Sequence, residues 1–231
     1  MQINPFNNDS VVTKIFDMFC DFIFSGELKP GDKLPPENEL AEQLCVGRNS
    51  LREAKKMLTA IGVLQEMRGS GTFVADQVSP LMFNPLLFSM LVEAKNSDDV
   101  YELKVMFEVA SIKIVIDKAT DEEIELIYAE LKECEELINK GVADINLFVK
   151  HDIDFHTKIY SMTKNPLIER IGKAINELFR QFMIKSYMQE DGIKRSISNH
   201  FKIINLIKNR DKENVNKVIE ETMAEWKSRW L

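Results

Sequence analysis

The stretch from Pro30 to Val74 constrains what this chain can fold into more than any other part of the sequence. Within it, apolar residues recur every three or four positions and predict a helix with one buried face: Leu51, Ala54, Leu58 and Ile61. Basic residues recur at the same spacing on the opposite face, where they can reach DNA phosphates and base edges: Arg48, Arg52 and Lys55. A buried face together with arginines in the N-terminal half is what a helix-turn-helix requires of its recognition helix.

Short elements before this helix complete the motif. Residues 37–44 predict a first helix, Val46 and Gly47 predict a tight turn, and Asn49 or Ser50 can cap the second helix. An amphipathic helix with exposed arginines would by itself also fit an ordinary solvated surface. The ordered succession of helix, turn and helix favours DNA binding.

A basic hairpin is predicted after the second helix. Gly62 ends that helix, and residues 63–67 and 72–74 predict two strands. The connection between the strands, Arg68-Gly69-Ser70-Gly71, is rich in glycine and carries a basic residue. We interpret the hairpin as a wing that extends the DNA-binding surface.

This part of the chain resembles the winged helix-turn-helix of the GntR family of bacterial transcription regulators. The matching residues are Leu28–Pro35, Glu37, Glu39–Ala41, Val46, Arg48, Leu51–Ala54, Gly62 and Gly69–Val74. By this resemblance the DNA-binding residues are Arg48, Asn49, Ser50, Arg52, Arg68 and Gly69. The resemblance implies that the helix reads bases or phosphates and that the wing reaches the minor groove. Gly47 stands where the family usually has serine, and Asn38 where it often has arginine, which leaves the operator preference open.

The length and charge of the chain fit two domains. A chain of 231 residues is long for one core, and its 45% hydrophobic residues are ordinary for a globular protein. We expect a DNA-binding domain over residues 1–76 and a second domain over residues 77–231. The net charge is −7, but five basic and two acidic residues lie between Val46 and Gly71. This local excess governs DNA contact, because physiological salt screens charges beyond about 8 Å.

The cysteines and the apolar stretches indicate in which cellular compartment the protein is expected. Cys20, Cys45 and Cys134 are odd in number and widely spaced, so we expect neither a disulfide framework nor a cysteine metal cluster. We find no signal-peptide pattern, and the apolar stretch 85–92 is too short to span a membrane. A cytoplasmic protein without a membrane partner is expected.

The rest of the chain shows helical periodicity. Residues 10–25 predict an amphipathic helix, and residues 75–80 carry turn formers and predict a linker. The helices predicted beyond the linker are 81–94, 98–118, 121–140, 143–164, 166–189, 193–209 and 212–231. Thr120 with Glu123 predicts a capping box, and Asn165 before Pro166 predicts an N-cap. The expected fold is therefore mainly α, with an N-terminal winged helix-turn-helix that includes a small β-hairpin and a C-terminal all-α bundle.

Three polar residues interrupt the apolar stripes of the second domain. Asp152 and His156 lie one turn apart on the inward face of one predicted helix, and His200 lies on the inward face of another. A buried carboxylate is costly unless it is paired or binds a metal. Two imidazoles and a carboxylate suit zinc, nickel or manganese-like ions and leave a position open for water or an effector oxygen. The alternative is a metal-free polar network in which Asp152 pairs with a histidine.

The second domain resembles, more weakly, the FCD ligand-binding domain of FadR-type GntR regulators. The resemblance rests on Glu102, Lys104, Glu108, Asp152, Phe155, His156, Asn165, His200, Ile203 and Ile207. It implies an antiparallel helical bundle that holds a metal with one Asp and three His and binds small organic or sugar acids. By this resemblance Lys104, Asn165 and Thr222 contact the effector. Thr222 stands where the fourth ligand, a histidine, is expected, so either water completes the metal site or the metal has been lost.

Together these observations predict a transcriptional regulator and not an enzyme. Among regulators, they favour a repressor. It would be a homodimer that binds a pseudo-palindromic double-stranded operator, and a small carboxylate would bias the spacing of its two DNA-binding domains. One alternative is a metal-free regulator that senses a larger apolar effector such as an acyl thioester. Two others are a metalloenzyme that activates water at the Asp/His cluster and an architectural DNA binder without an effector.

Overall fold

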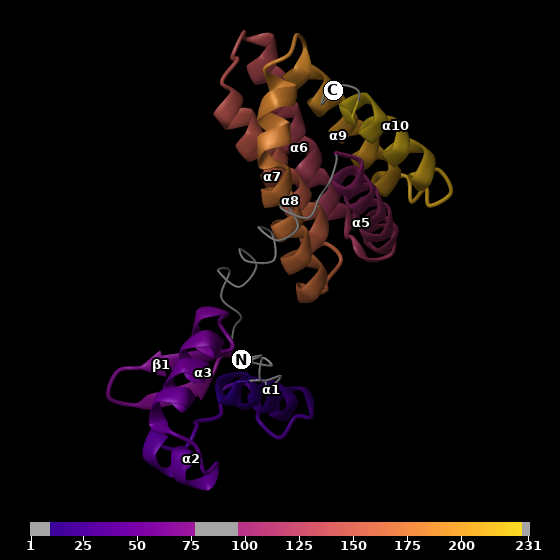
Figure 1. Ribbon diagram of the computed structural model, residues 1–231. Coiled ribbons are helices and arrows are strands. Elements are labelled where there is room, and N and C mark those ends of the chain that lie inside the picture. The colour runs from indigo at the N-terminus through magenta and orange to yellow at the C-terminus, as the bar shows by residue number, and fades with distance from the viewer. Residues whose placement is uncertain (1–9, 77–96, 228–231) are drawn as a thin grey trace, which may run out of the picture. The chain divides into compact units, whose positions relative to one another are not determined.

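The computed structural model describes residues 10–76 and 97–227 (Figure 1). The chain divides into two compact units, Met1–Leu86 and Leu87–Leu231, and each has its own hydrophobic core. The predicted helix 81–94, the apolar stretch 85–92 and most of the predicted linker lie outside the described residues. The domain boundary predicted after residue 76 therefore stays a prediction.

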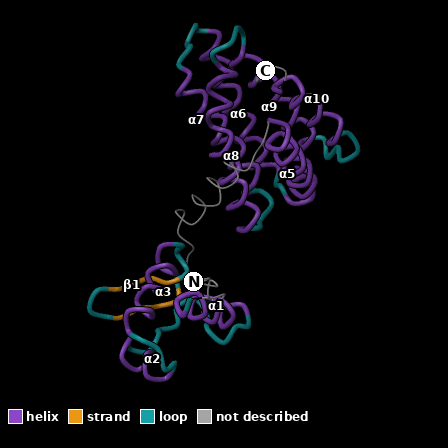
Figure 2. Tube along the Cα trace, in the orientation of Figure 1, coloured by secondary structure: helices purple, strands orange, loops and turns teal. Residues whose placement is uncertain are grey.

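Three helices and a hairpin form the N-terminal unit (Figure 2). They are α1 Val11–Phe24, α2 Glu37–Gln43, α3 Arg48–Ala60, β1 Leu64–Met67 and β2 Gly71–Val74. Their shared core contains Ile15, Phe19, Leu40, Leu51, Ala54 and Leu58. The predicted order of helix, turn, helix and hairpin is confirmed.

The start of α3 differs from the prediction. The helix begins at Arg48, so the capping position falls on Gly47, and no side chain accepts a hydrogen bond there. Asn49 and Ser50, the predicted caps, lie within the first helical turn instead. Cys45, which follows the end of α2, adopts a left-handed conformation with φ 51°, as is common just after a helix.

The wing is a two-stranded antiparallel sheet that is extended by the loop before α2. Leu64 lies opposite Val74, and Met67 lies opposite Gly71. Lys33 forms an isolated antiparallel bridge with Phe73. This bridge holds the loop before α2 against β2, so β2 lies between that loop and β1.

Six described helices form the C-terminal unit. They are α5 Ser97–Lys118, α6 Asp121–Asn139, α7 Ile145–Ser161, α8 Pro166–Tyr187, α9 Gly192–Lys208 and α10 Val215–Lys227. The closest pairings are α7 with α8, α6 with α9 and α5 with α10 (Figure 1). The predicted all-α architecture is confirmed. Within the two described ranges, no helix is both long and apolar enough to cross a membrane.

Local capping interactions set the starts of two of these helices. The Thr120 side chain accepts from the Glu123 backbone N–H, and the Glu123 carboxylate accepts from the Thr120 N–H, which makes a capping box before α6. Asn165 Oδ1 accepts from the backbone N–H groups of Leu167 and Ile168, with Pro166 at the first position of α8. Both predicted caps are confirmed.

Helices α7 and α8 approach closely where Gly172 faces Tyr160. A methyl group added to Gly172 would lie 2.1 Å from Tyr160 Cδ2 and 2.6 Å from two further ring atoms. The missing side chain therefore lets the Tyr160 ring lie directly against the α8 backbone. This contact places the Tyr160 hydroxyl in the interior of the unit, where the ring is fully buried.

Candidate functional site

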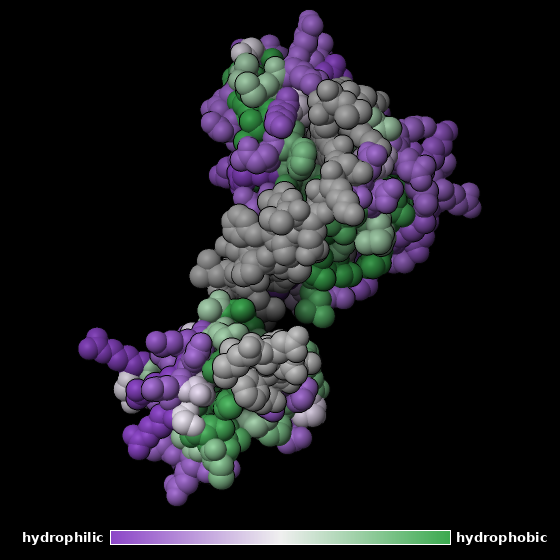
Figure 3. Space-filling view, in the orientation of Figure 1, coloured by the Kyte–Doolittle hydropathy of each residue, from purple (hydrophilic) through white to green (hydrophobic). Residues whose placement is uncertain are grey.

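The exposed face of α3 and the β1–β2 turn form what we call the reading surface. The predicted residues Arg48, Asn49, Arg52, Arg68 and Gly69 are all exposed, and Ser50 is half-buried. Figure 3 shows a mainly hydrophilic surface on the side of the N-terminal unit where the hairpin lies. The arrangement offers guanidinium groups from two elements to one nucleic acid partner.

A carboxylate from α2 holds two basic side chains of α3. Glu37 Oε2 accepts from Arg52 Nε at 2.8 Å, and Glu37 Oε1 accepts from Lys55 Nζ at 2.9 Å. These hydrogen bonds, first from Arg52 and then from Lys55, hold the pKa of Glu37 below its ordinary value. The contact uses Arg52 Nε and does not engage the two terminal guanidinium nitrogens.

Lys55 does not belong to the reading surface. Its spacing predicted a DNA-facing position, but the residue is only 5% exposed and is paired with Glu37. The prediction was wrong because Lys55 borders the buried Ala54 and because the Glu37 carboxylate on α2 draws its ammonium inward.

A groove beside the wing contains a basic residue that the sequence did not reveal. The groove is lined by Lys33, Glu37, Lys55 and Arg68, among others. Lys33 Cε would lie 3.1 Å from a methyl group on Gly71, so this lysine crosses the hairpin closely. Its place next to the wing follows from the bridge to β2, which no local sequence pattern predicts.

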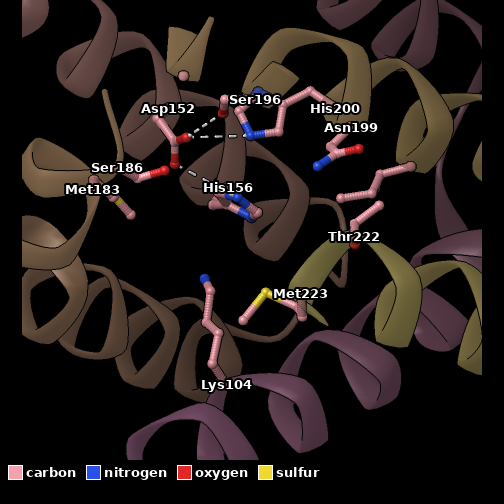
Figure 4. A pocket seen from close by; sticks show the side chains of 12 residues that line it. Lys104, Asp152, His156, Met183, Ser186, Ser196, Asn199, His200, Thr222 and Met223 are labelled. Atoms are coloured by element: carbon pink, nitrogen blue, oxygen red, sulfur yellow. Dashed lines mark hydrogen bonds and ion pairs between the residues drawn. The ribbon is translucent and has the colours of Figure 1, made fainter. Parts of the chain in front are cut away.

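A small cavity lies inside the helical unit (Figure 4). Its volume is about 70 Å³, which is room for a metal ion and a molecule of a few heavy atoms. Its polar lining comes from α5, α7, α8, α9 and α10: Lys104, Asp152, His156, Ser186, Ser196, Asn199, His200 and Thr222. Figure 4 shows these side chains converging on the cavity, with Asp152 and Thr222 on opposite sides.

The structure brings the three predicted metal ligands together. His156 Nε2 lies 3.6 Å from Asp152 Oδ1, and His200 Nε2 lies 3.4 Å from Asp152 Oδ2. All three residues are buried, and the His200 ring stacks on Phe155 with the centroids 4.1 Å apart. The inward stripes of α7 and α9 therefore meet as predicted.

Further hydrogen bonds keep Asp152 ionised. Tyr187 donates its hydroxyl to Asp152 Oδ2, and Ser196 Oγ donates to the same oxygen at 3.0 Å. Burial alone would raise the pKa of Asp152, but His200, His156 and Tyr187 hold that pKa below its ordinary value. Burial lowers the pKa of His156, which favours the neutral imidazole that binds metals.

A second polar cluster lies beside the first. Lys104 Nζ is 2.6 Å from Glu108 Oε1 and donates to Tyr160 at 2.9 Å and to Asn176 Oδ1 at 3.0 Å. Glu108 Oε1 also lies 2.9 Å from His156 Nδ1, which joins the two clusters. Burial would raise the pKa of Glu108, but His156 and Lys104 hold it below the ordinary value. Sequence reasoning missed the roles of Tyr160 and Asn176, which are distant in sequence.

The three predicted effector residues have different positions. Lys104 and Thr222 line the cavity. Asn165 does not line it, because its carboxamide caps the start of α8. The Thr222 hydroxyl donates to the Ile219 carbonyl oxygen at 3.0 Å within its own helix.

The donor set fits a divalent metal. The donor atoms of Asp152, His156 and His200 all lie within 4.8 Å of one another. Ligand atoms about 2.0–2.2 Å from a tetrahedral ion lie about 3.3–3.6 Å apart, which matches the carboxylate–imidazole separations. Glu108 would orient His156 through its second ring nitrogen, as carboxylates do for metal-bound histidines.

Two family models match this chain. The model described as "FCD domain" matches residues 99–225, and the model described as "Bacterial regulatory proteins, gntR family" matches residues 12–74. The first match contains the whole cavity, and the second contains the whole reading surface.

Individual relatives agree with these matches. HTH-type transcriptional regulator LutR of Bacillus subtilis (strain 168) is 29% identical over 161 residues, which cover 70% of this chain and 72% of that protein. The galactonate operon transcriptional repressor of Escherichia coli (strain K12) is 25% identical, with 77% and 78% covered. A solved structure, Streptococcus agalactiae GntR, is similar with a TM-score of 0.61 and 25% identity, covering 94% of this chain and 100% of that chain.

Proposed function

This chain belongs to the gntR family of bacterial regulatory proteins and carries an FCD domain, and from that premise we propose that a small organic or sugar acid governs its binding to DNA. The acid would bind in the cavity of the helical unit beside a divalent metal such as zinc, nickel or manganese. Regulators of this family are DNA-binding transcription factors and not enzymes, which sets aside the reading of the Asp/His cluster as a metalloenzyme site.

One observation carries the proposal. Asp152, His156 and His200 are buried and converge on a cavity that Lys104 also lines. Buried ionisable groups around an internal cavity are costly for stability and are typical of ligand sites. The name of the galactonate operon transcriptional repressor connects one relative with a sugar acid through the operon that it regulates.

The proposed DNA complex contains two copies of the chain. Two reading surfaces on a homodimer would bind adjacent half-sites of a pseudo-palindromic operator. Leu167 and Ile171 lie one turn apart on α8, and both are exposed. Such apolar surface supports association with a second copy. Repression is the expected outcome of operator binding.

One observation favours the alternative in which the Asp/His cluster binds no metal. Tyr187 and Ser196 both donate hydrogen bonds to Asp152 Oδ2, so this carboxylate oxygen has partners without an ion. The volume of about 70 Å³ argues against an acyl thioester as the occupant of this cavity.

Replacing Arg52 with alanine should weaken operator binding by about 1–3 kcal/mol if its guanidinium contacts a base. The reason is that Arg52 is the exposed member of the Glu37 cluster, whereas Lys55 keeps its bond to Glu37 after the substitution. DNA selected by the wild-type protein from a random pool would serve as the probe in gel-shift titrations.

A matched control separates this effect from general loss of charge. Arg180 is a half-buried arginine on α8 that pairs with Glu177, outside the reading surface. Arg180→Ala should leave operator affinity unchanged. Equal affinities for wild type and Arg52→Ala would contradict the assignment of α3 as the recognition helix.

Replacing His156 with alanine should remove most of the metal from the purified protein, because a buried ligand is lost from a three-residue set. Elemental analysis after metal loading and desalting would measure this, with near-stoichiometric metal expected in the wild type. His151→Ala is the control, because His151 lies on the same helix but lines a different cavity. Equal metal content in all three proteins would contradict the metal site.

A further inference from the structure

The Glu37 carboxylate on α2 is held at both of its oxygens by side chains of α3. Oε2 accepts from Arg52 Nε at 2.8 Å, and Oε1 accepts from Lys55 Nζ at 2.9 Å. These bonds keep the pKa of Glu37 below its ordinary value, so the carboxylate is ionised at neutral pH. An ionised group that is engaged at both oxygens is restrained to one orientation.

Lys55 fixes the position of this carboxylate. The Lys55 side chain is 6% exposed, so breaking its pair with Glu37 would leave a buried charge without a partner. Exposed ion pairs contribute little to stability, in part because both side chains lose conformational freedom when they pair. In this cluster Lys55 already holds Glu37, so only Arg52 has to be ordered for its bond to form.

The bond to Glu37 directs the Arg52 guanidinium without occupying its outer edge. The Arg52 side chain is 59% exposed, and among the described residues its two terminal nitrogens have no hydrogen-bond partner. Because a guanidinium is planar, a bond at Nε restrains the plane in which the terminal N–H groups lie. The exposed face of α3 therefore presents a pre-oriented pair of donors.

Two donors in this arrangement match one base better than the others. Guanine presents the acceptors O6 and N7 side by side in the major groove, and the bidentate arginine contact to them is the commonest specific contact to a base. A phosphate also accepts from arginine, but the negative charge of Glu37 beside Arg52 repels it and disfavours sequence-independent contact. The carboxylate thus supports base recognition and opposes non-specific binding.

We propose that Glu37 is a positioning residue that holds Arg52 for bidentate contact with a guanine in each half-site of the operator. The inference rests on the proposed operator complex and adds which base Arg52 selects and which residue orients it. Glu37 acts through Arg52 and repels phosphates. Loss of its carboxylate should therefore lower the preference for guanine without lowering the affinity for unrelated DNA.

Gel-shift titrations of the full-length chain test this inference. DNA selected by the wild-type protein from a random pool supplies the operator, and the base preference that disappears with Arg52→Ala marks the position that Arg52 reads. Three duplexes are then compared at one salt concentration: the operator, the operator with that pair changed from G·C to A·T in one half-site, and an unrelated duplex. We expect the wild type to prefer guanine to adenine by about 10-fold.

Glu37→Gln removes the charge and keeps the size of the side chain. Its amide offers one acceptor oxygen where the carboxylate offers two, so Arg52 and Lys55 compete for it. The preference for guanine should fall to about 2-fold, because the arginine is no longer held. Binding to the unrelated duplex should tighten by about 2-fold or more, because one negative charge is lost. Partial unfolding would instead weaken binding to all three duplexes by the same factor.

Lys55→Met is the matched control, because it alters the same cluster but leaves the bond between Glu37 and Arg52. It should retain most of the guanine preference and should bind the unrelated duplex more weakly, since a positive charge is lost. The double variant Glu37→Gln/Lys55→Met keeps the net charge of the chain and leaves no buried ammonium. It should lose the guanine preference without a gain in non-specific affinity, so it decides the question even if Glu37→Gln fails to fold.

The outcomes separate this inference from the DNA complex on which it rests. An unchanged guanine preference in both variants that carry Glu37→Gln would overturn the inference, as would an equal loss of preference in Lys55→Met. A base other than guanine at the position that Arg52 reads would overturn the choice of base. None of these results contradicts α3 as the recognition helix, which the loss of operator affinity in Arg52→Ala tests separately.

Discussion

Replacing Glu108 with leucine should lower the free energy of unfolding of the C-terminal unit by about 3–5 kcal/mol. Lys104 and Glu108 are 3% and 1% exposed and 2.6 Å apart, so the substitution leaves a buried ammonium without its counter-charge. Both tryptophans of the chain, Trp226 and Trp230, belong to this unit. Urea unfolding followed by tryptophan fluorescence would therefore report on this unit.

Two comparisons identify the unpaired charge as the cause. The double variant Lys104→Met/Glu108→Leu should recover most of the loss, because an apolar pair of similar volume can replace a buried ion pair at little cost. Glu136 and Lys140 form an exposed pair with the same i,i+4 spacing, and Glu136→Leu should cost less than about 1 kcal/mol. If the double variant is no more stable than Glu108→Leu, the ion pair is not the source of the effect.

The elements that the sequence predicted well depend on neighbours in the chain. The apolar stripe of α3, the capping box at Thr120 and the Asn165 cap are all set by residues within one or two helical turns. Short-range spacing and capping chemistry are visible in a sequence, since they need no knowledge of how helices pack. The start of α3 was predicted less well, because the helix begins at Arg48 and its capping position is Gly47, which has no side chain to act as a cap.

The site in the helical unit was predicted in part. The residues placed by helix periodicity were predicted, and the contacts made by helix packing were not. Asp152 and His156 share one helix face, and His200 marks the inward face of another, so their convergence followed from two stripes facing one core. The partners of Lys104 did not follow, because Tyr160 and Asn176 come from α7 and α8 and meet Lys104 only through helix packing.

Surface and border positions were the hardest to predict. Lys55 lies between the buried and the exposed face of α3, and its ammonium pairs with the Glu37 carboxylate of α2. The role of Asn165 was inferred from a family resemblance, which transfers residue roles without testing where each side chain lies. In this chain the position marks a helix start, and the carboxamide is occupied by backbone N–H groups.

Replacing Gly172 with alanine should destabilise the C-terminal unit, although helix propensity alone predicts the opposite. Alanine in a helix interior is favoured over glycine by about 1 kcal/mol. Against this gain, the new methyl group would lie 2.1 Å from Tyr160 Cδ2 in a fully buried contact. Overpacking of a core costs about 1–3 kcal/mol and sometimes more, so we expect a net loss of stability. Each 1 kcal/mol lost should lower the Tm by about 2–4 °C.

A double-mutant cycle can show that the destabilisation comes from the clash between the new methyl group and the Tyr160 ring. Tyr160→Leu removes the ring and is itself destabilising, because Lys104 and Glu108 lose a hydrogen-bond partner. In that background Gly172→Ala should cost much less than in the wild type or should stabilise the unit through its helix propensity. If Gly172→Ala lowers the stability equally in both backgrounds, contact with the Tyr160 ring is not the reason that alanine is unfavourable at this position. The cycle also tests the site, because the contact at Gly172 is what holds the Tyr160 hydroxyl between Lys104 and Glu108.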